Sequence, residues 1–131
     1  MRGGDTLSQA AKLAEHGNWA QAAQLYERAL ALDAQLPGTW IELGRTRREL
    51  GSLEAAIRAF RHALELEPAA TTWSLLSAAL REAGRYDEAV LAARSALALD
   101  PWLGEAHLNE GAALQLCQRS AAAVVSYLVA S

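Results

Sequence analysis

Cysteine and lysine are nearly missing from this chain, which holds one of each among its 131 residues. Because Cys117 has no second cysteine to join, no disulfide can form within the chain and no thiolate cage can hold a metal ion. A reducing compartment suits such a chain, so we expect it in the cytoplasm. The eleven arginines that accompany Lys12 indicate a GC-rich bacterial genome more than a binding requirement.

Long apolar runs and an excess of positive charge are also lacking. No stretch of roughly 18 apolar residues is present, and the first residues, Met1 to Asp5, lack the apolar core of a signal peptide. The net charge is −3, whereas proteins that bind a phosphate backbone normally carry a basic stripe. We therefore expect neither a membrane nor a nucleic acid as partner.

Residues typical of chemical sites are few and scattered. His16, His62 and His107 lie far apart in the sequence, and none has a second histidine or a cysteine at helical spacing. Cys117 has no adjacent histidine or aspartate to activate it. The sequence also lacks a glycine-rich loop after a predicted strand, which is the arrangement that binds phosphate groups. We expect no catalytic residue, no cofactor and no metal, and hence no enzyme.

What the chain does contain is helical periodicity interrupted by glycines. From Ala56 to Leu64, apolar residues recur at three- and four-residue steps and share one helix face. Gly51 follows a helical run and favours a left-handed residue that ends the helix. Gly17 precedes Gly51 by 34 residues, Gly84 follows it by 33, and Gln118 stands 34 further on. The chain is therefore predicted to be all-α, with four similar units.

The second unit carries the fullest pattern, Trp40-x2-Leu43-Gly44, then Ala56-x3-Phe60, Ala63 and Pro68. This pattern resembles the tetratricopeptide repeat (TPR) family, although Arg47 stands where the family prefers an aromatic residue. The resemblance implies a right-handed superhelical solenoid of about four helix-turn-helix repeats, forming a single domain over residues 1–131. We expect the repeats at about 3–36, 37–69, 70–103 and 104–131, with the last one truncated.

The fourth unit departs from the pattern. It carries His107 and Glu110 where the second unit has Trp40 and Leu43, and Gln118 takes the place of the turn glycine. Stacks of this kind usually end in a polar cap, but the last residues are apolar. We expect a possible oligomer contact at three positions that are charged or polar in the second unit: Val125, Leu128 and Val129.

In the resembled family the first helix of each repeat lines a concave peptide-binding groove. Carried over position by position, the predicted lining is Leu7, Ala11, Ile41, Arg45, Arg48, Ser74, Ala78, Arg81, Leu108, Ala112 and Gln115. Two interpretations of its three arginines stay open. They face one opening and bind a carboxylate or phosphoserine, or they pair with Glu42, Glu49 and Glu82 and only solvate the surface.

Some members of that family clamp the carboxylate end of heat-shock chaperones with lysine, asparagine and arginine. The matching positions here hold Leu7, Ala11, Glu42, Thr71 and Leu75. Shifting the frame by one repeat gives Ile41, Arg45, Leu75, Glu105 and Asn109, which still lacks two of the cations. A chaperone clamp is therefore not expected.

These observations predict a non-enzymatic scaffold that binds a peptide or protein segment in its concave groove. One alternative is a substrate-recruiting or targeting arm of a larger bacterial enzyme, glycosyltransferase- or hydroxylase-like, with a catalytic domain beyond Ser131. Another is self-association through the last helix. The identity of the partner does not follow from the sequence.

Overall fold

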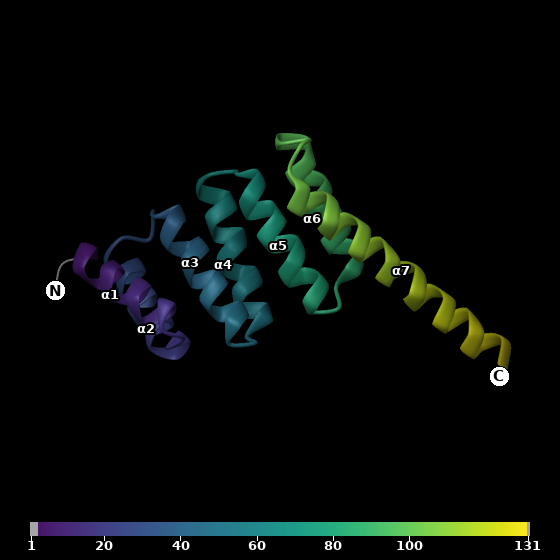
Figure 1. Ribbon diagram of the computed structural model, residues 1–131, viewed down its shortest axis with the longest axis horizontal. Coiled ribbons are helices and arrows are strands. Elements are labelled where there is room, and N and C mark those ends of the chain that lie inside the picture. The colour runs from purple at the N-terminus through teal and green to yellow at the C-terminus, as the bar shows by residue number, and fades with distance from the viewer. Residues whose placement is uncertain (1–2, 131) are drawn as a thin grey trace.

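The computed structural model describes residues 3–130. Within that range the chain forms helices and no strand, and the helices stack side by side along the long axis of the molecule (Figure 1). Their bounds are α1 Gly3–Glu15, α2 Trp19–Leu32, α3 Pro37–Glu49, α4 Leu53–Leu66, α5 Ala70–Glu82, α6 Tyr86–Leu99 and α7 Gly104–Ala130. The prediction of an all-α, right-handed superhelical solenoid is confirmed.

Each of the first three hairpins turns on a glycine in the left-handed region. Gly17, Gly51 and Gly84 have φ angles of 77°, 80° and 79°, where a residue with a Cβ would cost roughly 1–2 kcal/mol. At Gly51 the amide donates to the carbonyl of Arg48 at 3.0 Å, and the next amide, of Ser52, donates to Arg47 at 2.9 Å. Both bonds satisfy carbonyls left over at the end of α3, so the turn is closed by its own backbone.

The core lies between the two rows of helices. One cluster joins α1, α2 and α3 around Tyr26 and Leu43, and a second joins the later helices around Phe60 and Leu80. The Phe60 ring is fully buried and lies where Gly44 has no side chain: a Cβ built on Gly44 would be 2.6 Å from the ring. The glycine at this position therefore allows α3 and α4 to pack around an aromatic ring.

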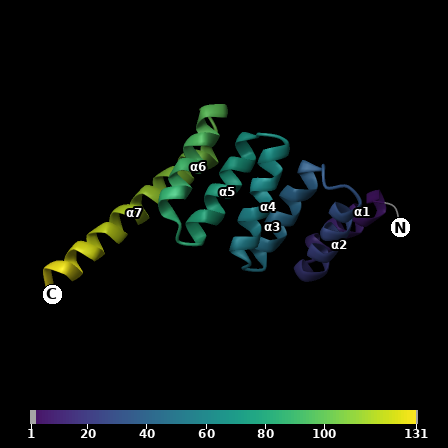
Figure 2. The same cartoon turned by 180° about the vertical axis from the view of Figure 1, so that it is seen from behind.

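The expected turn at Gln118 is wrong. Instead, α7 runs without a break from Gly104 to Ala130, and its second half projects from the end of the stack (Figures 1 and 2). The physical reason is local. Gln118 has a Cβ and resists the left-handed conformation, and the residues that follow include Ala121, Ala122 and Ala123, which favour helix.

Candidate binding groove

The first helices of the repeats line a trough made of three adjoining hollows. Hollow A has a volume of about 470 Å³ and lies between α1 and the start of α3. Hollow B, about 400 Å³, lies between α1, α2 and α3, and hollow C, about 450 Å³, is lined by α3, α5 and α7. Ala11 lines both A and B, and Arg48 lines both B and C. The three hollows therefore adjoin one another along the first helices of the repeats.

Nine predicted groove residues line these hollows. They are Leu7, Ala11, Arg45, Arg48, Ser74, Ala78, Arg81, Leu108 and Ala112. Ile41 instead packs, partly buried, against the core cluster, and Gln115 is exposed on α7 outside the three hollows. That any of them binds a ligand stays a prediction.

The predicted lining left out Leu75, which lines hollows B and C, and Asn109 and Glu105, which line hollow C, although the chaperone-clamp comparison places all three at groove positions. Leu75 and Asn109 each stand one residue after a predicted lining residue. A helix presents a stripe at i, i+3, i+4 and i+7, so a wider helical stripe would have included them.

Arg48 is neutralised by a carboxylate from the next repeat. Its guanidinium donates to both oxygens of Glu82, with Nε at 3.0 and 2.9 Å from them. The hydrogen bond from Arg48 holds the pKa of Glu82 below its usual value, and the same bond raises the pKa of Arg48. Arg48 therefore bridges α3 and α5 and adds little free positive charge to the trough.

Arg81 is differently placed. Its Nε is buried and has no hydrogen-bond partner among the described residues, although it lines hollow C. A buried donor left unpaired costs about 1–3 kcal/mol. By contrast, Arg45 is 3.8 Å from Glu42, both side chains are more than half exposed, and such a pair contributes little.

A side-chain amide fixes the wall of hollow C. Asn109 on α7 donates to both the backbone carbonyl and the hydroxyl of Ser74 on α5, at 3.0 Å in each case. Ser74 is buried, so its hydroxyl serves the contact between helices. The rest of the lining of hollow C is apolar or charged. It consists of Leu75, Ala78, Leu108, Ala112, Arg48, Arg81 and Glu105.

The histidines and the cysteine take part in structural contacts. The His62 ring stacks on Trp40 with centroids 4.4 Å apart, and His107 Nε2 is 2.8 Å from the carbonyl of Pro101. Desolvation and a hydrogen bond to Asp87 raise the pKa of Cys117, which keeps its thiol protonated. Within residues 3–130, no group of three or more histidine, cysteine, aspartate or glutamate side chains could hold a metal ion.

In the described part of the chain, no helix combines the length and the apolar character needed to cross a membrane.

Two tetratricopeptide repeat family models match the chain, one over residues 6–38 and one over residues 41–101. A comparison with curated protein sequences found no match. Solved structures with the same fold include the TPR domain of Arabidopsis OM64, which is 20% identical with a TM-score of 0.79, the alignment covering 85% of this chain and 93% of that one.

Two further structures hold peptides. The first TPR of Spaghetti (RPAP3), bound to the HSP90 peptide SRMEEVD, is 18% identical with a TM-score of 0.81, and the alignment covers 91% of this chain and 93% of that one. The second TPR domain of human RPAP3, in complex with the HSP70 peptide SGPTIEEVD, is 16% identical with a TM-score of 0.79, covering 82% and 91%. At these identities the likeness shows the fold.

Proposed function

Because the chain belongs to the tetratricopeptide repeat family, we propose that it is a non-enzymatic scaffold that holds a segment of a partner protein in the trough of hollows A, B and C. The observation that carries this proposal is the row of adjoining hollows lined by helices of all four repeats, with the Arg81 side chain in the lining of hollow C. We place this scaffold in the cytoplasm, as the cysteine content favours.

The chemistry of hollow C favours a partner segment with an apolar residue next to an anion. Leu75, Ala78 and Leu108 offer apolar surface, and Leu108 is 75% exposed on α7. Arg81 offers a donor for a carboxylate or a phosphoserine, and such charge-assisted bonds are about twice as strong as neutral ones. Hollow B suits an anion less well, since its lining includes three carboxylates, those of Glu15, Glu42 and Glu49, whereas the lining of hollow C includes one, that of Glu105.

The peptides in the two RPAP3 structures are acidic at their ends, which agrees with an anionic ligand for this chain in charge only. Leu7 and Ala11 line hollow A and are apolar, and the lining of this hollow holds no cation among the residues that the structure describes. We therefore propose an acidic segment held at Arg81 in the middle of the partner, rather than a chaperone tail clamped by its end.

The test uses an array of synthetic peptides with apolar residues followed by aspartate, glutamate or phosphoserine. We expect Arg81→Gln to weaken binding of the selected peptides by about ten- to hundredfold, since one charge-assisted hydrogen bond contributes about 1.5–3 kcal/mol. Arg94→Gln is the matched control, because Arg94 pairs with Glu110 at 3.0 Å and lines none of the three hollows. Equal affinities for both variants would remove Arg81 from the proposal.

The enzyme-arm alternative stays a prediction from the sequence. No cluster of described residues supports the enzyme-arm alternative. A reading frame that continues past Ser131 into a catalytic domain would support it.

A further inference from the structure

On α7, one glycine of the repeat pattern lacks the aromatic ring that packs against its counterpart in the second repeat. In the second repeat, Gly44 makes room for Phe60, which stands 16 residues later and is fully buried. In the fourth unit Gly111 takes the place of Gly44, and Tyr127 follows it at the same separation of 16 residues. Yet Gly111 is exposed, and no described atom lies within 4 Å of a Cβ built on it. The space that an aromatic ring fills in the second repeat is open here.

The identity of the residue at this position varies with its partner along the chain. Where the residue 16 positions later is small, as Ala93 is, the first position holds Ser77, whose hydroxyl donates to the carbonyl of Ala89 at 2.7 Å. Where the residue 16 positions later is aromatic, as Phe60 is, the position equivalent to Ser77 holds a smaller residue, here Gly44. Gly111 with Tyr127 repeats the second combination, so the fourth unit has the residues for a closed hairpin.

The same chain cannot close that hairpin as it stands, because α7 is one continuous helix through Gln118. Residues 120–130 therefore project from the stack, with no charged residue among them. Val124, which takes the place of the buried Ile57 of the second repeat, is 58% exposed. An uncharged apolar helix of this kind marks a docking surface.

We infer that α7 pairs antiparallel with α7 of a second copy of this chain, so that residues 120–130 of each copy take the hairpin position against Gly111 of the other. This arrangement keeps the helix straight through Gln118 and fills both open positions at once. It is isologous, as a two-fold dimer requires, and it is an exchange of identical elements. The second copy suits the position because its own Ala123 and Tyr127 carry the pattern of the missing helix.

The pairing assigns the two faces of the projecting helix different roles. Ala123 corresponds to Ala22, Ala56 and Ala89, all of which are fully buried against the first helix of their own repeat. Leu128 corresponds to Glu27, Arg61 and Arg94, all of which are exposed. In the pair, Ala123 therefore lies inside and Leu128 outside, which separates this arrangement from a contact through Val125, Leu128 and Val129.

Light scattering coupled to size exclusion tests the inference on the full chain at several concentrations. We expect a mass of twice 14.0 kDa for the wild type and a single-chain mass for Ala123→Arg. Leu128→Arg, the matched control, should keep the doubled mass. Both residues are exposed in the single chain, so circular dichroism should show both variants folded.

Gln118→Gly provides an independent readout. It restores the turn residue found at Gly17, Gly51 and Gly84, so each chain should close its own hairpin and the doubled mass should fall to one chain. A single-chain mass for the wild type at every concentration overturns the inference. So does dissociation by Leu128→Arg that equals or exceeds that by Ala123→Arg.

Discussion

At the scale of single residues, the packing of this protein is decided by which side chains are missing. Gly44 has no Cβ, and the Phe60 ring occupies the space that a Cβ would need. The ring is fully buried and cannot move aside without disturbing the close-packed cluster around it.

Gly44→Ala should therefore lower the free energy of unfolding, even though alanine is the better helix former. The overpacked ring would cost about 1–3 kcal/mol, more than the gain of roughly 0.5–1 kcal/mol from replacing glycine in a helix. Urea denaturation measures the difference. Gly38→Ala on the same helix is the control, because a Cβ there meets no described atom within 4 Å, and a loss of stability equal to that of Gly44→Ala would contradict the explanation.

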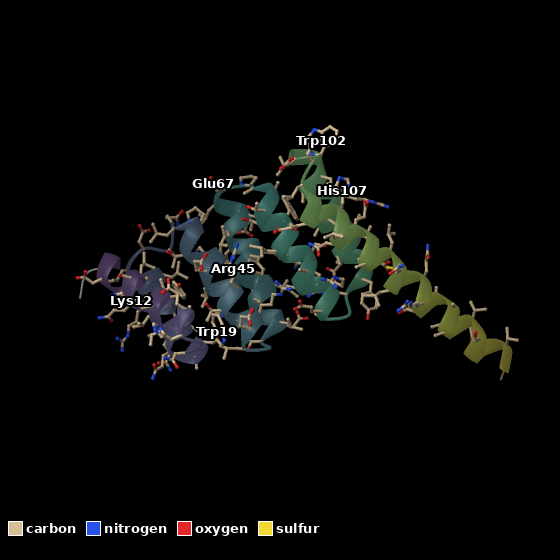
Figure 3. All side chains as sticks on the ribbon, viewed as in Figure 1. Lys12, Trp19, Arg45, Glu67, Trp102 and His107 are labelled. Carbon is tan, nitrogen blue, oxygen red and sulfur yellow. The ribbon has the colours of Figure 1, made fainter. Side chains whose placement is uncertain are left out.

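Trp40 and Trp102 should respond differently to truncation. Trp40 packs against the first core cluster, stacks on His62 and donates from its indole nitrogen to the carbonyl of Ala34 at 2.9 Å. We expect Trp40→Ala to cost about 3 kcal/mol. Trp102 is 91% exposed at the turn before α7 (Figure 3), so Trp102→Ala should leave the denaturation midpoint unchanged, and a large shift there would be against this account.

At the scale of helices, the sequence predicted the turns wherever their cause was a residue type. Gly17, Gly51 and Gly84 require a left-handed conformation, and all three end a helix. At Gln118 the turn was inferred from the repeat period alone, without a residue that favours it, and α7 continues. The repeat period predicts which positions are equivalent. Whether the helix ends at such a position depends on the residue that stands there.

The same distinction applies to the trough. Its lining followed from helical periodicity, because residues on one face of a helix share surroundings. The pairing of Arg48 with Glu82 did not follow, because the two residues are 34 positions apart and meet only when α3 and α5 stack. Carboxylates on its own helix, such as Glu49, were equally plausible partners from the sequence.

The Arg48–Glu82 pair should make the contact between α3 and α5 depend on pH. Because the folded pKa of Glu82 lies below its ordinary value of 4.5, the pair stabilises the fold above that value and loses its effect as the pH falls through the lower, folded pKa. Both side chains are about one-third exposed, so solvent limits the effect to about 0.5–1 kcal/mol.

Chemical denaturation at neutral and acidic pH checks this expectation. Glu82→Gln should be less stable than wild type near pH 7, and the gap should shrink in acid. Glu65→Gln is the control, because Glu65 forms no ion pair within the part of the chain that the structure describes. A gap that stays constant across the pH range would show that the Glu82 carboxylate is not its source.

At the scale of the whole molecule, packing contacts join helices that neighbour each other in the chain, together with α3 to α5 and α5 to α7. Stability in such a stack is close to a sum over repeats and the interfaces between them. A defect at one end should then stay local.

Tyr26→Ala tests this locality, because Tyr26 is buried in the cluster that joins α1, α2 and α3. We expect amide hydrogens of α1 and α2 to lose protection against exchange while those of α5 and α6 keep theirs. Mass spectrometry of exchanged peptides resolves the two regions. Uniform loss of protection along the chain would mean that the stack unfolds as one cooperative unit.

The serial arrangement of the helices also bears on how the trough can change shape. A small rotation between one hairpin and the next changes the curvature of the solenoid, and the rotations at successive boundaries add up. The curvature can therefore change while the packing within each hairpin stays the same. The trough can therefore tighten around a slender segment or open for a bulky one with little rearrangement of its walls. Small-angle X-ray scattering with and without a bound peptide would detect that change as a shift in the radius of gyration.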